Sequence, residues 1–417
     1  MPSITALKGR IVFNSRGNKT IEIDVITDKK YLARACAPSG ASVGKHETQS
    51  FPNDNPEKAL EALNANTKKF VGLDAQDPKV ISDVLRTIDN TKTYSKIGGA
   101  VAYALSIAAI DSAAKALGVP MFKLLKPTRP YRFPFPLGNI LGGGAHAGTG
   151  TPDIQEFLAC PIGARNIREG LEMNFKLHKE LSKVIESVDK HFTYGRGDEG
   201  AWAPHVNNDQ ALEIIEKAVK NCGFILGKDI SLGIDFASSS FWDEKKKVYN
   251  YSRQGIIRNT EEQIDFANHL IKNYKLIYLE DPVNEEDFES MAIITKENPK
   301  CLVTGDDMLV TNAGRVKEAA KYKACSGAIL KVNQIGSLQD AMVFAEECIK
   351  NNIKIITSHR SGESSDSHIS HIAIATDSKM IKSGVVGGER VAKLNELLRL
   401  SEYDLIEGMA ELSSTYE

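Results

Sequence analysis

The sequence predicts an α/β protein in which an N-terminal α+β module precedes a closed barrel of alternating strands and helices. Three observations support this prediction. Residues 3–35 alternate apolar and polar side chains with a period of two, as antiparallel strands do. A proline-spaced stretch at 126–136 interrupts the chain, and such stretches commonly separate structural units. Beyond it, short apolar runs are each followed by a helix-length amphipathic stretch, the pattern of parallel strands joined by helices.

The N-terminal module, residues 1–130, is expected to hold one small sheet and several helices. The strand alternation is clearest at 21–25, and a polar turn at 28–30 favours an antiparallel meander. A glycine-bearing loop at 37–54 follows the meander. Helical periodicity then recurs in three stretches, 57–71, 78–89 and 98–117.

The remaining residues, 131–417, are expected to form the barrel. So many strand and helix units in about 280 residues favour a closed barrel over an open sheet. No internal sequence repeat or long linker divides this part of the chain. The apolar runs are SLGID, LIYLED, CLVTGDD, GAILKV and IKIITSH.

Composition and charge argue against several classes of function. The 52 basic and 54 acidic side chains nearly cancel to a net charge of −2, so no strong field would attract nucleic acid or an anionic membrane. No apolar run approaches the ~20 residues of a membrane span. The N-terminus also lacks the basic and apolar segments of a secretory signal. We therefore expect a cytoplasmic protein that binds neither nucleic acid nor membrane.

Ionisable side chains end five successive apolar runs. Carboxyl ends of barrel strands meet on one face, and that face holds the active site of βα-barrel enzymes. An Asp after a strand can instead cap the next helix, but Glu is a poor cap residue, and one of the five is a Glu. The regular placement therefore favours a shared site. The five residues are Asp235, Glu280, Asp306, Lys331 and His359, separated by about one βα unit apart from a longer first interval.

Three carboxylates at one barrel mouth predict a bound cation. Asp235, Glu280 and Asp306 would repel one another unless a positive ion lay among them. Oxygen ligands without His or Cys select a hard ion, Mg²⁺ or Mn²⁺. Lys331 would be desolvated beside this charge, which lowers the pKa of an ammonium and makes Lys331 a candidate base. A lysine that extends from an ordinary strand to solvent is the alternative.

Two glutamates are candidates for the complementary acid. Glu156 lies inside the apolar run IQEFLACP, so its carboxyl group should be protonated or paired. Glu199 lies in the glycine-bounded loop YGRGDEGAWAP, where a solvated turn is the alternative. Two such glutamates opposite a lysine would supply an acid to complement a base.

Taken together, these motifs resemble the enolase family, the phosphopyruvate hydratases. The resemblance covers essentially the whole chain in order, and it implies that residues 1–130 are a lid domain and that 131–417 form a modified TIM-type (β/α)8 barrel. LKVNQIGS and SHRSGE are its most specific motifs. The full series is NSRGNKTIEIDV, PSGAS, GGGAHAG, QEF, GDEGAWAP, LEDP, GDDMLVTN, LKVNQIGS, SHRSGE and ERVAKLNELLR.

The resemblance implies two metal ions in each active site. Asp235, Glu280 and Asp306 look like the ligands of a first Mg²⁺, with Mn²⁺ as a possible substitute. Ser42, in the loop at 37–54, looks like the protein ligand of a second.

The resemblance also assigns catalytic and substrate-binding roles. Lys331 matches the base that removes the C2 proton of 2-phosphoglycerate. Glu199, assisted by Glu156, matches the acid that helps the C3 hydroxyl leave. Arg360 and Ser361 match phosphate contacts. The other positions matched to the substrate are His146, Gln155, His359, Lys393, Glu280 and Asp306.

The implied activity is the reversible dehydration of 2-phospho-D-glycerate to phosphoenolpyruvate in glycolysis and gluconeogenesis, by a homodimer or a larger oligomer. One alternative is a superfamily relative that dehydrates another acid sugar, although a non-phosphorylated substrate would leave Arg360 and Ser361 unpaired. The other alternative is a retired enolase homologue that serves as a binding or scaffold protein. The complete set of acid, base and metal ligands disfavours it.

Several positions depart from the family pattern without removing a named catalytic group. The path from His146 to Gln155 is one residue longer than usual, with Thr149 where Asn is frequent, and this loop could shift His146. The altered N-terminal motif could change the subunit interface. The other departures are Asn14 and Lys19 in the DSRGNP motif, Ala201 and Trp202 in GGFAP, and Gly387 and Gly388 before ERLAK.

Overall fold

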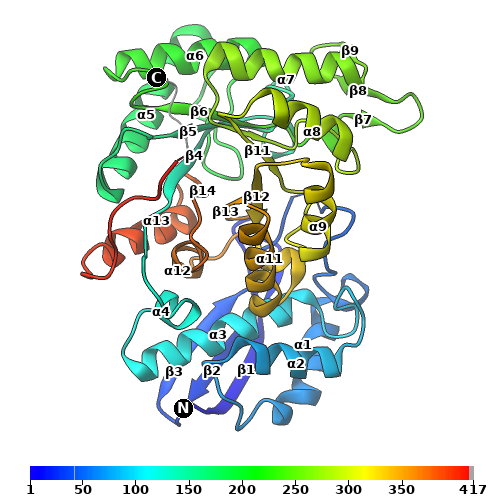
Figure 1. Ribbon diagram of the computed structural model, residues 1–417, viewed down its shortest axis with the longest axis vertical. Coiled ribbons are helices and arrows are strands. Elements are labelled where there is room, and N and C mark those ends of the chain that lie inside the picture. Colours follow the sequence, from blue (N-terminus) through cyan, green and yellow to red (C-terminus); the bar gives the residue numbers. More distant parts are fainter. Residues whose placement is uncertain (42, 413–417) are drawn as a thin grey trace.

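The computed structural model describes residues 1–41 and 43–412. A small sheet with its helices lies at one end of the long axis, and a closed barrel lies at the other (Figure 1). The chain passes between them after α4 (Met121–Leu125) and before β4 (Phe135–Gly142). The predicted α/β class, with an α+β part ahead of a barrel, is confirmed.

The N-terminal sheet is the predicted antiparallel meander. Its strands are β1 (Ile4–Phe13), β2 (Lys19–Thr27) and β3 (Tyr31–Cys36), in that order. On one face Asp24 accepts hydrogen bonds from Arg10 and Arg34 of the neighbouring strands, which are stabilising cross-strand pairs. The other face packs against a long helix, α3 (Gly99–Leu117).

Helix α3 is buried in the core. It is long and apolar enough to cross a membrane, but 78% of that stretch is buried inside the protein. Gly118 ends it in the left-handed conformation at φ +65°, which glycine adopts without strain. The other N-terminal helices are η1 (Pro52–Asp54), α1 (Pro56–Asn66), η2 (Thr67–Lys69) and α2 (Pro78–Ile88).

Eight strands close the barrel, in the order β10-β11-β12-β13-β14-β4-β5-β6. β5 runs antiparallel to both β4 and β6, whereas the other neighbouring pairs are parallel. This is the modified barrel that the sequence predicts. The strands after β4 are β5 (Glu156–Cys160), β6 (Ser231–Asp235), β10 (Tyr278–Glu280), β11 (Leu302–Gly305), β12 (Gly327–Leu330), β13 (Lys354–Ser358) and β14 (Met380–Gly384).

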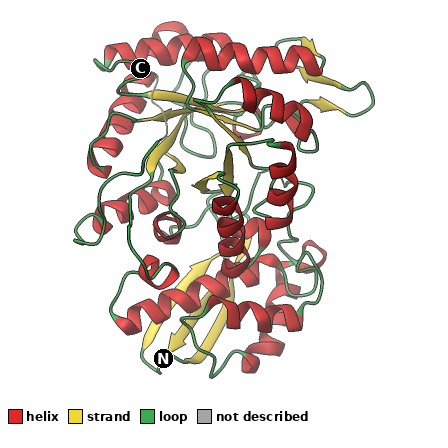
Figure 2. Cartoon of the chain, viewed as in Figure 1, coloured by secondary structure: helices red, strands yellow, loops and turns green. Residues whose placement is uncertain are grey.

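Helices surround the barrel (Figure 2). α3 packs against α10 and α11, and Ser106 of α3 accepts a hydrogen bond of 3.0 Å from the backbone N–H of Leu338 at the start of α11. These contacts fix the small sheet relative to the barrel. The barrel helices are α5 (Ile167–Val188), α6 (Asn208–Asn221), α7 (Thr260–Tyr274), α8 (Phe288–Glu297), α9 (Ala313–Tyr322), α10 (Val332–Ile335), α11 (Leu338–Lys350), α12 (His368–Ala375) and α13 (Gly388–Leu400).

A second small sheet is inserted between β6 and α7. It comprises β7 (Trp242–Asp243), β8 (Val248–Tyr251) and β9 (Ile256–Arg258), all antiparallel. This insertion explains why the first interval between the strand-end residues is longer than one βα unit. Short 3-10 turns, η3 (Gly144–His146) and η4 (Ser238–Ser240), follow β4 and β6.

Candidate active site

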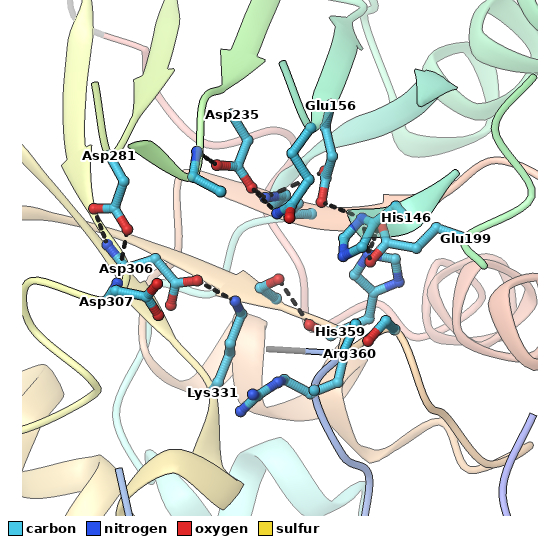
Figure 3. Close-up of a pocket in the computed structure, with 17 residues that line it drawn as sticks. His146, Glu156, Glu199, Asp235, Asp281, Asp306, Asp307, Lys331, His359 and Arg360 are labelled. Atoms are coloured by element: carbon cyan, nitrogen blue, oxygen red, sulfur yellow. Dashed lines mark hydrogen bonds and ion pairs between the residues drawn. The ribbon is translucent and has the colours of Figure 1, made fainter. Parts of the chain in front are cut away.

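A cavity of about 460 Å³ opens at the carboxyl ends of the barrel strands. Asp235, Asp306, Lys331 and His359 line it from four different strand ends, and Figure 3 shows their side chains converging. Glu280 is fully buried beside them. The helices that follow β6, β10 and β11 are capped instead by Asn259, Asp287 and Asn312. The structure therefore excludes the helix-cap interpretation of the strand-end acids and places all five predicted residues together.

Lys382 lies at the centre of the acidic side of the cavity, although the sequence analysis did not single it out. Its Nζ lies 2.9 Å from Asp235 Oδ2, 2.5 Å from Glu280 Oε2 and 3.2 Å from Glu156 Oε2. Burial opposes the charged form, but the three carboxylates outweigh it and hold the pKa of Lys382 well above its ordinary value. The signal was present in Met-Ile-Lys-Ser-Gly, a strand-like run with one lysine like the run that holds Lys331.

The structure corrects the expected position of Lys393, which does not line this cavity. Its Nζ donates hydrogen bonds to the backbone oxygens of Ser364, Asp366 and Glu389 at 2.7–3.0 Å. It also forms an ion pair of 3.0 Å with Glu363. The physical reason is that Lys393 belongs to α13, outside the barrel, and ties this helix to the loop after β13. Lys382 on β14 occupies the place expected for it.

Glu156 and Glu199 are buried carboxyl groups that both lie beside His146. His146 Nδ1 lies 3.3 Å from Glu156 Oε1 and 3.7 Å from Glu199 Oε1. Burial and the neighbouring Glu199 raise the pKa of Glu156. Burial would also raise the pKa of Glu199, but His359 and His146 outweigh it and hold that pKa well below its usual range. A proton on this pair is therefore favoured on Glu156 over Glu199.

Arg390 sets the tautomer of His359. The guanidinium is fully buried, and its Nη1 lies 2.8 Å from His359 Nδ1. Arginine has donors only, so Nδ1 must accept, and the ring proton is on Nε2, 3.0 Å from Glu199 Oε2. Burial lowers the pKa of His359 to about 4, so the ring is neutral. Arg390 also donates to the backbone oxygens of Arg360 and Ser361, which fixes the chain after β13.

Lys331 forms an ion pair with Asp306. Burial disfavours the ammonium, but Asp306 outweighs burial and raises the pKa of Lys331 above its ordinary value. The lowered pKa expected from the sequence is therefore wrong for this arrangement. A lowered pKa of Lys331 requires a cation that draws the carboxylate of Asp306 away from Nζ. The second oxygen of Asp306 accepts a hydrogen bond of 2.8 Å from Gln334.

The strand-end carboxylates fit a hard cation. Glu280 and Asp235 are direct neighbours in the register of β10 and β6. Glu280 Oε1 is buried without a hydrogen-bond partner, and burial together with Asp235 raises the pKa of Glu280 well above its usual value. A second group of carboxylate oxygens, from Asp281, Asp306 and Asp307, lies within 4.8 Å of one another. Such a set of oxygens suits Mg²⁺ or Mn²⁺ rather than a softer metal.

The loop at 37–54 reaches over the barrel face. Gly40 and Ala41 line the cavity, whereas the predicted metal ligand Ser42 lies outside the described residues. Glu47 forms an ion pair with both terminal nitrogens of Arg360, at 3.0 and 3.1 Å. Two backbone hydrogen bonds of 2.8 Å join Ser39 to Gly362. The loop is thus tied to the chain segment that follows β13.

The remaining predicted contacts also border the cavity. Arg360 and Ser361 line it, and Ser361 Oγ is buried without a hydrogen-bond partner. Gln155 Nε2 donates to Asp235 Oδ2 at 3.3 Å. These donors suit an anionic ligand, because an unsatisfied buried hydroxyl gains most from a charged acceptor.

Gly384 offers a test of how tightly Glu199 is held. A Cβ at this position would lie 1.9 Å from the backbone oxygen of Glu199 and 3.1 Å from Cγ of Arg390. Gly384→Ala must therefore displace Glu199, and we expect kcat to fall by about 100-fold while far-ultraviolet circular dichroism stays native. Gly388→Ala is the matched control, since a Cβ added there would have no neighbouring atom within 4 Å. Equal activity of the two variants would show that the position of Glu199 does not matter.

The side chains that line this cavity indicate the class of enzyme to which the protein belongs. A buried lysine lies beside an oxygen-rich cluster, with two opposed glutamates at the other side. Such groups remove a proton next to a carboxylate while positive charge stabilises the resulting anion. The fold and the site define a barrel enzyme of the metal-dependent, proton-abstracting class.

Comparison with known proteins gives the family. The family model "Enolase, C-terminal TIM barrel domain" matches residues 130–410, and "Enolase, N-terminal domain" matches residues 4–125. An enolase of Methanosphaera stadtmanae is 44% identical over 405 residues, which cover 97% of this chain and 98% of that protein. An enolase of Methanothermobacter thermautotrophicus is 39% identical over 411 residues, covering 98% and 99%. The chain belongs to the enolase family, whose members are hydro-lyases.

Proposed function

We propose that this chain catalyses the reversible dehydration of 2-phospho-D-glycerate to phosphoenolpyruvate in the cavity described above. The single observation that carries the assignment is the placement of Lys331 and the Glu156–Glu199 pair on different sides of one cavity (Figure 3). A dehydration that removes a proton from C2 and a hydroxyl group from C3 needs a base and an acid so placed.

Lys331 is the base in this proposal. Its Nζ must be neutral to accept the C2 proton, so the stabilisation that Asp306 gives to the ammonium has to be weakened. A metal ion held by Asp306 would do this. Lys382 remains beside Asp235 and Glu280 as a fixed positive charge. We assign to it the place at the substrate that the family resemblance suggested for Lys393, where it would stabilise the anion.

Glu199 and Glu156 are the acid in this proposal. A proton on this pair is favoured on Glu156, and His146 lies within reach of both carboxylates. His359 and Arg390 orient Glu199 toward the leaving hydroxyl group. The hydroxyl group departs with the proton that the pair supplies.

Two Mg²⁺ ions, for which Mn²⁺ could substitute, complete the site in this proposal. Asp235, Glu280 and Asp306 would hold the first ion, and Ser42 would hold the second. When bound, the ions supply positive charge to the carboxylate and to the dianion formed at C2. The phosphate of the substrate would bind to Arg360 and Ser361. The other side of the substrate would contact His146, Gln155 and His359.

We also propose a division of labour between a lid domain, residues 1–130, and the barrel, residues 131–417. The enzyme would work in the cytoplasm as a homodimer or a larger oligomer, in glycolysis and gluconeogenesis. A subunit contact would cover Phe13, which is 69% exposed at the end of strand β1. The near-neutral net charge of −2 supports the absence of nucleic-acid and membrane partners.

The loop at 37–54 should close further when substrate binds. Glu47 already ties the loop to Arg360, and a ligand in the cavity would add contacts with Gly40 and Ala41, which line it. We expect the amides of residues 37–50 to gain protection in hydrogen exchange when 2-phosphoglycerate and Mg²⁺ are added together. Glu47→Gln, which keeps the shape and removes the charge, should reduce this gain. Identical protection with and without ligand in the native protein would contradict closure.

A substrate comparison separates the proposal from its alternatives. Purified protein with Mg²⁺ should form phosphoenolpyruvate from 2-phosphoglycerate, as followed by ultraviolet absorbance, and should not act on non-phosphorylated acid sugars. Turnover of an acid sugar without turnover of 2-phosphoglycerate would favour the superfamily alternative. No turnover of either substrate by the folded, metal-loaded protein would favour a retired homologue.

A further inference from the structure

The loop that carries His146 has few buried side chains in its first limb, residues 144–150, whereas residues 151–155 of its second limb are all buried. It runs from Gly143 to Gln155, and His146 is its one buried side chain between residues 144 and 150. Backbone hydrogen bonds of 2.9 Å join Gly143 to Gln155 and Gly144 to Pro152 at the base of the loop, and Thr151 Oγ1 donates to the backbone oxygen of Gly148 at 2.7 Å. His146 itself is held from outside the loop by the backbone N–H of Asp198, which donates to the backbone oxygen of His146 at 3.2 Å, and the flanking limbs need further contacts to keep their separation.

Arg253 supplies such contacts from the turn between β8 and β9. Its Nη1 donates to the backbone oxygens of Thr151 and Pro152, at 3.2 and 2.9 Å, and to Thr151 Oγ1 at 2.6 Å. Its Nη2 donates to the backbone oxygen of Gly144 at 2.8 Å. One guanidinium thus bridges both limbs of the loop. Although Arg253 is an exposed residue, its planar fork is suited to holding several acceptors at once.

Two further contacts connect the turn between β8 and β9 to the loop. The backbone N–H of Arg253 donates to Asp153 Oδ1 at 3.0 Å. Gln254 Oε1 accepts a hydrogen bond of 2.6 Å from Asn208, whose own oxygen accepts from the backbone N–H of Ile154 at 3.1 Å. The inserted sheet β7–β9 (Figure 1) is therefore connected to the loop through adjacent residues of one turn.

We propose that Arg253 is a positioning residue that acts through His146. By joining the two limbs, it holds His146 between Glu156 and Glu199, and the inserted sheet is the support on which it acts. This inference rests on the proposed function, in which those glutamates supply the proton. A loop one residue longer than in the family pattern has more conformations to exclude, and the guanidinium provides that restraint.

The first test compares Arg253→Met and Arg253→Lys with Lys245→Met, which removes the same charge from the same sheet without touching the loop. Arg253→Met should lower kcat about tenfold, because a small misplacement of an active-site group is costly. KM should change much less, since the proposed phosphate contacts lie elsewhere. Arg253→Lys should recover only part of kcat, because one ammonium cannot hold both limbs. Lys245→Met should behave as the native protein.

A structural measurement accompanies the kinetics and does not depend on activity. In Arg253→Met, hydrogen exchange at the amides of Gly143 and Gly144 should become faster, whereas exchange in the barrel strands should not change. Unchanged exchange in this loop would overturn the proposal, and so would faster exchange with unchanged kcat. If the native protein shows no turnover, the proposed function fails, while the exchange result still decides whether Arg253 orders the loop.

A double-mutant cycle tests whether the effect passes through His146. In a His146→Ala background, Arg253→Met should cause little further loss of kcat, because the group that it positions is already gone. An equal tenfold loss in both backgrounds would overturn the proposal. Thermal unfolding of each variant shows whether it is folded, and Arg253→Lys serves as the test variant if Arg253→Met does not fold.

Discussion

Lys331→Ala is expected to abolish exchange of the C2 proton of 2-phosphoglycerate with deuterated solvent. Among the residues that the structure describes, Lys331 has one carboxylate partner, Asp306, which a metal ion can draw away. Lys382, the other lysine that lines the cavity, is instead surrounded by Asp235, Glu280 and Glu156. Without Lys331 as the base no carbanion-like intermediate forms, so exchange and turnover should both be lost. Loss of general acid or base help typically costs 10²–10⁴-fold, about 3–5 kcal/mol.

Glu199→Gln is the matched comparison, because it should block only the second half of the reaction. The base and the metal ligands remain, so the intermediate can form and return with solvent deuterium even though the hydroxyl group cannot leave. Proton nuclear magnetic resonance of 2-phosphoglycerate in deuterated buffer measures exchange, and phosphoenolpyruvate formation measures turnover. If Glu199→Gln lost exchange as completely as Lys331→Ala while still binding substrate and Mg²⁺, the acid and base assignments would have to be abandoned.

Glu280→Gln is expected to remove binding of the first metal ion without weakening the metal-free fold. Glu280 is fully buried beside Asp235, and one of its oxygens has no hydrogen-bond partner. Burial and Asp235 raise the pKa of Glu280 well above its usual value, so its charge is costly in the metal-free protein. Its ion-pair partner Lys382 still keeps Asp235 at 2.9 Å and Glu156 at 3.2 Å when Glu280 is replaced. The free energy of unfolding in the presence of chelator should therefore be unchanged or higher, while calorimetric Mg²⁺ affinity is lost.

Asp306→Ala is the control, because it should lower the free energy of unfolding of the metal-free protein. It should also weaken metal binding, but it leaves the buried Lys331 without its ion-pair partner. Removing one partner of a buried pair typically costs about 3 kcal/mol or more, so this variant should be less stable than the native protein in chelator. Native Mg²⁺ affinity in Glu280→Gln would refute the assignment of Glu280 as a ligand.

The shared location of the residues that end the barrel strands could be predicted, because the order of strands and helices along the chain is enough to determine it. A residue that ends a parallel barrel strand must lie at the same mouth as its counterparts, and Asp235, Asp306, Lys331 and His359 all line the cavity. No knowledge of packing is needed for that step. The small N-terminal sheet followed equally from the local alternation of apolar and polar residues.

The choice between Lys382 and Lys393 could not be made in the same way. Both lysines lie in one stretch of chain. To decide between them, one must know where β14 ends and in which direction α13 runs from it. Gly387, the residue just before that helix, has φ +110°, so the turn depends on a backbone conformation that composition does not reveal. Lys393 is then directed to backbone oxygens outside the cavity.

The residues that orient the site were beyond sequence reasoning for a different reason. Arg390 acts on His359 and on backbone oxygens far away in the chain, and Arg253 acts on the loop around Thr151. Glu47 reaches Arg360 from the opposite part of the molecule. Contacts between a side chain and a distant backbone leave no periodic pattern, so only the assembled fold displays them.

The reaction itself provides the most direct measurement. Phosphorus nuclear magnetic resonance can follow the purified protein with Mg²⁺ after addition of either 2-phosphoglycerate or phosphoenolpyruvate. We expect both starting compounds to reach the same mixture, and we expect chelation of the metal to stop the conversion in both directions. Persistence of both compounds unchanged, with a folded protein that binds Mg²⁺, would contradict the account.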